Sequence, residues 1–260
     1  MKQFGLALGS SGARGSSYVG FLKALEDEGL KPSFISGSSM GSVVGGCYAI
    51  GMSPDQMITE LKNLKFSQLL DISLSPHKNA ALLRSNKLVK KLDEYFKGKC
   101  FKDTKIPFSA VASDLIEGKT FVFKPEDKLA LGVAASSSIP GLFKPIEKDG
   151  AYLVDGGVTC RLPIGQVRGL GADVVIAVDA LGGIRRANKV YNIMSVLLRS
   201  YDIMEGEVTR YRTDELAPDI IIEPELGEMS QYKFKNFDGA IEAGYKACMD
   251  NIDKIKALFE

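Results

Sequence analysis

The sequence is poor in histidine and cysteine, and this scarcity limits the chemistry that it can support. His77 is the only histidine among 260 residues, and its place in the loop LSPHKN is typical of a solvated surface residue. The four cysteines are widely scattered and include no CxxC pair. This spacing argues against a zinc site and does not suggest a disulfide framework. A catalytic triad built around histidine is therefore improbable.

Long apolar runs and a strong net charge are missing as well. No apolar run reaches the roughly 18 residues of a membrane span, and the chain start leads into a glycine loop, unlike a signal peptide. The formal net charge is +1, so no overall charge draws the chain toward nucleic acid or anionic lipid. We expect a cytoplasmic globular protein whose 45% apolar residues bury a sizeable core.

Strand and helix patterns alternate along the chain. Short apolar runs predict strands, and the segments between them predict helices with apolar faces. The runs that predict strands cover residues 4–9, 33–37, 106–115, 118–123, 151–157, 172–180 and 219–224. This alternation favours an α/β fold with three layers, α/β/α, around a mostly parallel central sheet.

The chain shows no internal repeat and no linker, so we expect a single domain over residues 1–260. The parts of the chain differ in character: a motif-bearing part covers about residues 3–180, and a helical C-terminal part covers about residues 187–260. Within the latter, residues 188–212 predict a long helix and residues 238–259 predict one closing helix.

Two adjacent serines follow the second predicted strand, in the stretch GSSMGS. Gly37, Ser39 and Gly41 fit the pattern GxSxG, in which a serine occupies a sharp turn between a strand and a helix. The following helix N-terminus would favour an alkoxide at Ser39. A serine-rich turn that only caps the helix has the same pattern. The motif alone therefore leaves both interpretations open.

A second glycine-rich turn, LGSSGARG, joins the first predicted strand to the first helix. Its GxxGxxG spacing does not match the GxGxxG dinucleotide loop, and it lacks the Gly-Lys pair of a P-loop. Its glycines leave backbone N–H groups free to face an anion, and Arg14 adds fixed charge. An oxyanion hole is the remaining interpretation. Since consecutive strands are usually neighbours, we expect this turn beside Ser39.

A serine nucleophile needs a base, and the sequence offers carboxylates. In the usual hydrolase order histidine comes last, whereas His77 precedes every good acid candidate. Three aspartates stand at the ends of predicted strands, namely Asp114, Asp155 and Asp179. Asp155 is the best candidate, because Gly156 and Gly157 let the chain turn away and leave its carboxylate exposed at the strand end. A plain Asp-Gly-Gly turn is the alternative.

Together these blocks resemble the patatin-like phospholipase family. The two glycine-serine turns resemble its glycine loop and nucleophile elbow, and VASDLIEGKTFVF resembles its middle strand pair. AASSSIPGLFKPI and YLVDGGVTCRLPI resemble its Ala-Ser block and its Asp-Gly-Gly block. The blocks occur in the family order between about Gly5 and Ala180. The C-terminal third is similar only in being helical. The resemblance implies the patatin-like α/β fold.

The resemblance also implies a function. The chain would be a lipid acyl hydrolase, of the phospholipase A, lysophospholipase or carboxylesterase type, that forms an acyl-serine with a Ser-Asp dyad. Ser39 would be the nucleophile and Asp155 the general base. Ser10, Ser11 and Gly12 would form the oxyanion hole, held by Arg14. The implied partner is a lipid or acyl-ester substrate, with no nucleic acid, metal or other cofactor. A lipid acyltransferase and a regulator with little turnover stay open as alternatives.

The chain departs from the family pattern in two places. The family loop is usually an unbroken glycine run, and a positive φ at Ser10 or Ser11 would distort the oxyanion hole. The residues before LPI are usually asparagines, but here they are Cys160 and Arg161, which bears on substrate preference. The leucine-rich residues 64–83 either cap an acyl pocket and touch a membrane surface transiently, or form an ordinary packed excursion.

Overall fold

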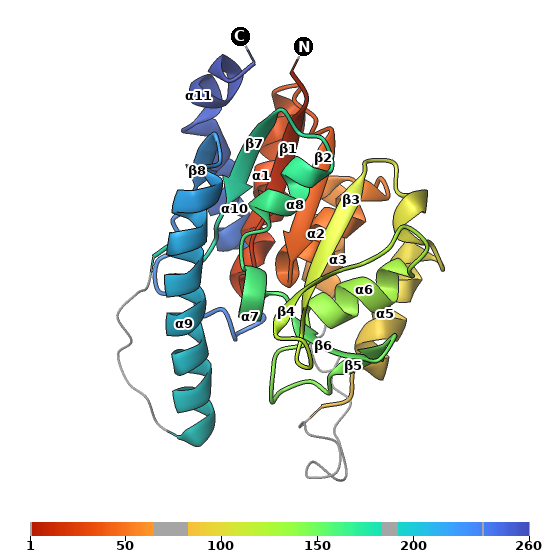
Figure 1. The fold of residues 1–260 in the computed structure, drawn as a ribbon. Coiled ribbons are helices and arrows are strands. Elements are labelled where there is room, and N and C mark those ends of the chain that lie inside the picture. Colours follow the sequence, from red (N-terminus) through yellow and green to blue (C-terminus); the bar gives the residue numbers. More distant parts are fainter. Residues whose placement is uncertain (1, 65–82, 184–191, 236, 260) are drawn as a thin grey trace.

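The computed structural model describes residues 2–64, 83–183, 192–235 and 237–259 (Figure 1). His77 and almost all of the leucine-rich stretch lie outside these ranges. The described chain forms one sheet in the order β5-β6-β3-β2-β1-β7-β8, with β4 paired to β3. The strands are β1 (Phe4–Leu8), β2 (Phe34–Ser38), β3 (Phe108–Asp114), β4 (Lys119–Val122), β5 (Ile146–Lys148), β6 (Ala151–Asp155), β7 (Val174–Val178) and β8 (Ile220–Ile222).

The centre of the sheet is parallel and one side of it is antiparallel. β1 pairs in parallel with β2 and β7, β2 pairs in parallel with β3, and β7 does so with β8. The pairs β3–β4, β3–β6 and β5–β6 are antiparallel. The predicted strand pair around the turn IEG is therefore confirmed as β3 and β4. Since β8 pairs with β7, the C-terminal part of the chain contributes to the same sheet.

Helices cover both faces of the sheet and make three layers, as predicted (Figure 1). On one face lie α1 (Ser17–Asp27), α2 (Met40–Ala49) and α10 (Asp238–Met249), with α3 (Pro54–Asn63) packed on α1 and α2. On the other face lie α8 (Ile164–Gly169) and α9 (Ile193–Leu216), next to the short α7 (Gly157–Cys160). The remaining elements are η1 (Gly12–Ser16), α5 (Asn86–Phe96), η3 (Phe101–Asp103), α6 (Leu129–Ser136) and α11 (Ile252–Ala257).

The apolar runs form strands because both faces of each central strand are covered. Leu6 and Leu8 of β1 point into the large core beneath α1 and α2, whereas Ala7 points into a smaller core with Ile164 and Val167 of α8. Successive side chains of a strand alternate between the faces of a sheet. A strand buried on both faces therefore has a continuous apolar run, as β1 and β7 do.

Some predicted helix limits were wrong. The closing segment is not one helix: α10 ends at Met249, and α11 begins at Ile252 after Asn251, whose side-chain amide donates to the Ala247 carbonyl. The long helix runs from Ile193 to Leu216 because a capping box, formed by Asn192 with Ser195, begins it. The elements β5, α7 and α8 are too short for periodicity to reveal. Within the described ranges, no helix has the length and apolar character needed to cross a membrane.

Candidate active site

The stretch GSSMGS forms a tight turn between β2 and α2. Ser39 has φ 52° and ψ −124°, a conformation that non-glycine residues rarely adopt and that costs about 1–3 kcal/mol. The flanking glycines are needed because the backbone folds so closely. A methyl group at Gly37 would collide with the Gly41 carbonyl, and one at Gly41 would collide with the Leu8 carbonyl. The structure therefore places Ser39 at the tip of a strained turn.

Ser39 and Asp155 are brought together by the order of strands around β3. Val111 of β3 pairs with Ser38 of β2 on one side and with β4 on the other. The next residue, Ala112, also pairs with β4, and on its opposite side it pairs with Asp155 of β6. The strands β2 and β6 therefore lie end to end along the same side of β3. Because β6 runs antiparallel, their carboxyl ends meet.

The hydroxyl of Ser39 donates a hydrogen bond of 2.6 Å to Oδ2 of Asp155. Both residues are buried, with 6% and 1% of their surface exposed. The other carboxylate oxygen, Oδ1, accepts from the Gly157 N–H at 2.8 Å and from the Ser10 hydroxyl at 3.5 Å. Burial raises the pKa of Asp155 to about 6, although these three hydrogen bonds oppose the shift. Asp155 is therefore ionised at neutral pH and is a stronger base than an ordinary aspartate.

The other two candidate aspartates have different partners. Oδ1 of Asp114 accepts from the Ile116 N–H, two residues along the chain. Asp179 forms a buried ion pair with Arg161. Of the three predicted candidates, Asp155 is the one hydrogen bonded to Ser39.

The glycine loop has a positive φ at Gly12 only, with a value of 52°, and at neither serine. The two serines are therefore compatible with the loop conformation. The Ser10 N–H donates to the Arg161 carbonyl at 2.9 Å. Among the described residues, nothing accepts a hydrogen bond from the N–H groups of Ser11 and Gly12. These two groups, rather than that of Ser10, are free to face an oxyanion.

Arg14 connects this loop to distant parts of the chain. Its guanidinium is buried and donates to the carbonyls of Ala180 and Met229, at 2.7 and 2.8 Å. These hydrogen bonds hold the loop against the segments that contain Ala180 and Met229. The charge of Arg14 is thus directed at backbone carbonyls of the surrounding chain.

Other residues around the loop were missed by the sequence analysis. The Gln231 carbonyl accepts from the Ala13 N–H at 2.8 Å, and the Gln231 side chain donates to Asp202 of α9. The Met40 N–H, directly after Ser39, has no acceptor among the described residues and is also free to face an oxyanion. The position of Met40 in GxSxG was the sequence signal that could have drawn attention to this N–H. Gln231 and Asp202 lie in the C-terminal third, where no motif marked them.

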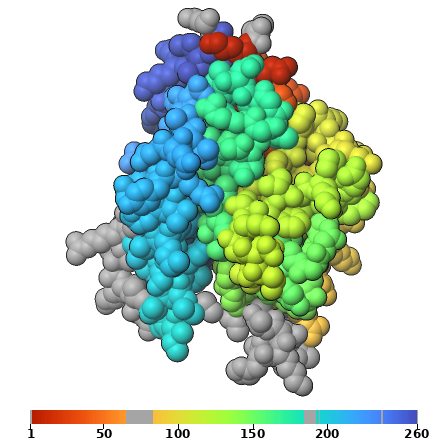
Figure 2. All heavy atoms as spheres, viewed as in Figure 1, coloured from red at the N-terminus to blue at the C-terminus, as the bar shows by residue number. Residues whose placement is uncertain are grey.

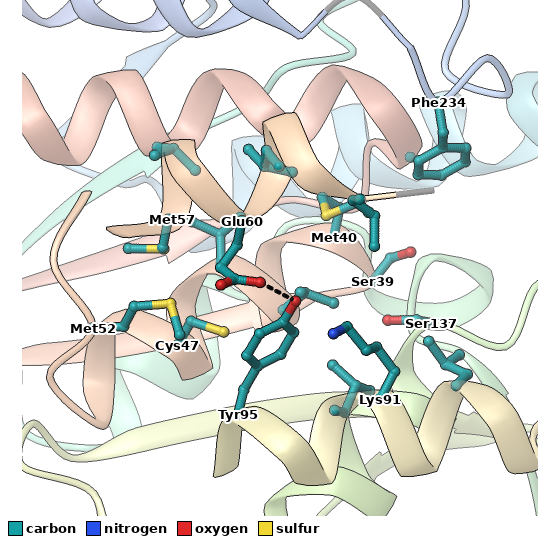
Figure 3. A pocket seen from close by; sticks show the side chains of 18 of the residues that line it. Ser39, Met40, Cys47, Met52, Met57, Glu60, Lys91, Tyr95, Ser137 and Phe234 are labelled. Atoms are coloured by element: carbon teal, nitrogen blue, oxygen red, sulfur yellow. Dashed lines mark hydrogen bonds between the residues drawn. The ribbon is translucent and has the colours of Figure 1, made fainter. Parts of the chain in front are cut away.

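An apolar pocket with a volume of about 150 Å³ begins at Ser39 and Gly12. Its wall on α2 consists of Met40, Val43, Val44 and Cys47, which share one helix face. Residues of α3 and α5, several residues between 137 and 143, and Phe234 also line the pocket. Figure 3 shows Ser39 toward one end and Cys47, Met52 and Met57 toward the other. Between the ends, the Tyr95 hydroxyl donates to Glu60 at 2.9 Å, and the Lys91 ammonium lies 4.8 Å from the centre of the Tyr95 ring.

This arrangement can activate a serine next to an apolar pocket. Such a site suits nucleophilic attack on a carbonyl that carries an apolar chain. In the part of the chain that the structure describes, no group of three or more histidine, cysteine, aspartate or glutamate side chains could hold a metal ion.

Comparisons with known proteins indicate the family of the chain. A family model described as patatin-like phospholipase matches residues 6–168. The chain is 38% identical over 179 residues to an NTE family protein of Mycobacterium bovis, which covers 68% of this chain and 49% of that protein. It is 31% identical over 181 residues to human patatin-like phospholipase domain-containing protein 6, which covers 67% of this chain and 13% of that protein. The chain thus spans about half the length of the mycobacterial relative.

Among solved structures, the chain is similar to VipD from Legionella pneumophila. The TM-score is 0.61 with 17% sequence identity, and the match covers 97% of this chain and 67% of VipD. At this identity the likeness concerns the fold. It extends over the C-terminal third, which the family model does not match.

Proposed function

The chain belongs to the patatin-like phospholipase family, and we propose that it is a lipid acyl hydrolase that cleaves carboxylic esters through an acyl-serine. The observation that carries this proposal is the 2.6 Å hydrogen bond from Ser39 to the buried carboxylate of Asp155. The apolar pocket that begins at the same serine supports a lipid acyl group as the substrate.

Acylation would begin with attack of Ser39 Oγ on the ester carbonyl carbon, while Oδ2 of Asp155 accepts the hydroxyl proton. The carbonyl oxygen becomes an oxyanion that accepts from the N–H groups of Ser11 and Gly12. The bond to the leaving alcohol then breaks, and Asp155 returns the proton to the alcohol oxygen. In deacylation water attacks the acyl-serine, Asp155 takes its proton, and the fatty acid leaves as the proton returns to Ser39.

A carboxylate can serve as the base here for two physical reasons. Burial brings the pKa of Asp155 to about 6, closer to working pH than the usual value of about 3.9. In addition, the helix N-terminus after Ser39 and the backbone donors of the glycine loop favour the negative charge that develops on oxygen. Each donor of this kind typically contributes about a hundred- to a thousandfold in turnover.

The proposal is tested by intact-mass labelling of the purified protein with a fluorophosphonate. We expect one adduct, mapped to Ser39. The labelling rate should be low in acid and rise through a midpoint near the Asp155 pKa of about 6, because Asp155 must lose its proton before it can accept that of Ser39. Hydrolysis of phospholipid and lysophospholipid vesicles, followed by release of fatty acid, then identifies the substrate class.

Two outcomes would contradict the proposal. Absence of an adduct on folded wild-type protein would show that Ser39 is not activated. An adduct whose rate does not change with pH around the Asp155 midpoint would show that another group is the base.

The substrate's acyl chain should lie along the α2 face of the pocket. Val43→Phe places a ring in that path one helical turn from Ser39. We expect the variant to lose at least roughly tenfold in kcat/KM on long-chain esters, since each buried methylene contributes about 0.8 kcal/mol. Short-chain esters should be cleaved nearly as before. A series of p-nitrophenyl esters of increasing chain length measures this.

Val122→Phe is the matched control for this variant. It introduces the same ring at an exposed position of β4, away from the pocket, and should leave the chain-length profile unchanged. An equal loss on short and long esters in Val43→Phe would mean that the acyl chain binds elsewhere.

A further inference from the structure

The helix α9 lies outside the residues that the family model matches. It nevertheless packs on α7, the short helix that follows Asp155 in the chain (Figure 1). Figure 2 shows the blue side chains of α9 running along one face of the molecule, against the green part of the chain that includes α8. From this helix, Glu205 is buried with 3% exposure, and the hydroxyl of Tyr201 is also buried.

These side chains meet Ser10 at Gly157. A methyl group at Gly157 would collide with the Tyr201 hydroxyl, and it would lie 2.7 Å from Glu205 Oε1 and 2.9 Å from Ser10 Oγ. Gly157 itself donates its N–H to Oδ1 of Asp155, and Ser10 donates its hydroxyl to the same oxygen. The polar atoms from α9 therefore converge on the side of Asp155 that faces away from Ser39.

The hydrogen bonds around this point are incomplete. Within the described ranges, the Tyr201 hydroxyl and Glu205 Oε1 have no partner. The Ser10 bond to Asp155 is 3.5 Å long, whereas hydroxyl bonds usually measure about 2.5–3.0 Å. A buried polar group without a partner costs about 1–3 kcal/mol. The Tyr201 hydroxyl and Glu205 Oε1 therefore have hydrogen-bonding capacity left for Ser10.

The charges around Glu205 determine whether it donates or accepts. Four charged side chains lie near Glu205: Arg161, which follows α7 in the chain, Asp155 of β6, Asp179 at the end of β7, and Asp202 of α9 itself. The hydroxyls of Tyr201 and Tyr232 also face it. Arg161 is already paired with Asp179. Burial raises the pKa of Glu205 well above its usual range, Arg161 opposes this, and Asp155 adds to it. Burial therefore favours the protonated form of Glu205, and in that form its carboxyl can donate a hydrogen bond.

We propose that Glu205 and Tyr201 are positioning residues for the catalytic base, acting through Ser10. They donate to Ser10 Oγ, and Ser10 in turn donates to Oδ1 of Asp155, so that Oδ2 stays directed at Ser39. The inference rests on the proposed function in that it treats Asp155 as the base.

The proposal predicts the direction in which Asp155 responds to changes at Glu205. Hydrogen bonds to an ionised carboxylate favour the ionised form. The bond from Ser10 lowers the pKa of Asp155 in this way. Glu205→Leu removes a donor to Ser10 without adding or removing a charge, and so weakens the Ser10 bond to Asp155. The midpoint of Asp155 ionisation should rise, by at most roughly one pH unit, the value of losing one charge-assisted hydrogen bond outright. Glu205→Gln retains an N–H donor and should keep the midpoint near that of wild type.

The experiment follows the titration of Asp155 by ¹³C NMR in full-length protein with labelled aspartate, assigned with Asp155→Asn. The pH dependence of fluorophosphonate labelling is measured in parallel. Glu207→Gln is the matched control, since Glu207 lies on an exposed part of α9 and pairs with Arg210. This variant should leave both midpoints unchanged.

The outcomes separate the inference from the proposed function. An unchanged midpoint in Glu205→Leu would overturn the inference, as would a rate that falls equally at every pH, which indicates a merely structural role. A downward shift in both Glu205 variants would show that Glu205 is ionised, and would also overturn it. Failure of wild type to be labelled would contradict the proposed function, while the NMR titration would still test the link to Asp155.

Discussion

Asp155→Asn should slow acylation of Ser39 by roughly 10²- to 10⁴-fold, the usual contribution of a general base. The asparagine has the shape of the aspartate and can still accept from the Gly157 N–H, but it cannot take the proton of Ser39. The rate constant of fluorophosphonate labelling measures this loss. Ser39→Ala should abolish the adduct altogether, since it removes Oγ, the attacking atom in the proposed mechanism.

The same change should stabilise the protein. The pKa of Asp155 is about 6 in the folded chain and about 3.9 in an unfolded one, so the folded state holds this proton more tightly. The proton on Asp155 stabilises the folded protein below a pH of about 4, and this stabilisation is lost as the pH rises through about 6. Asparagine does not titrate. Asp155→Asn should therefore gain about 2–3 kcal/mol in free energy of unfolding above pH 6, and little in acid.

Ser38→Ala is the matched control for the nucleophile, because Ser38 is the serine directly before Ser39 in GSSMGS. It is fully buried at the end of β2, and within the described part of the chain its hydroxyl has no hydrogen-bond partner. Its loss should leave labelling intact. An Asp155→Asn variant that keeps the wild-type labelling rate would exclude the Ser-Asp dyad. A loss of stability in this variant at neutral pH would mean that the carboxylate serves the fold instead.

Gly12→Ala should reduce turnover by roughly a hundred- to a thousandfold, the value of one oxyanion donor. Two effects act together at this position. The φ of 52° disfavours any side chain, and the new methyl group would collide with the Gln231 carbonyl. The loop would have to move, and the N–H groups of Ser11 and Gly12 would move with it. Steady-state hydrolysis of a short-chain ester measures the effect, and we expect kcat rather than KM to change.

Gly29→Ala separates these two effects. Gly29 also has a positive φ, of 70°, but a methyl group there would meet no atom within 4 Å. This control should lose about 1 kcal/mol of stability from backbone strain and retain full activity. If Gly12→Ala retains activity as well, the glycine loop is not the oxyanion hole, and the Met40 N–H becomes the main candidate.

Much of the motif-bearing part could be predicted because its signals are local. A run such as FGLAL is short and apolar throughout, which favours a strand covered on both faces. GSSMGS has glycines where the turn has no room for a side chain. Because the sequence has a single histidine, a carboxylate was the expected base. The C-terminal third offered no comparable signal, since its contributions are a backbone carbonyl at Gln231 and side chains of α9 that are dispersed in sequence.

The sequence by itself therefore determined the local features: most of the strands, the tight turn at Ser39, the glycine loop and the supply of candidate bases. Only the tertiary structure decided which carboxylate meets the serine. Asp155 reaches Ser39 because β6 runs antiparallel and ends against the end of β2 along one side of β3. Strand direction and register depend on pairing between segments far apart in the chain, and no local pattern encodes them. Burial at that junction, in turn, raises the pKa of Asp155.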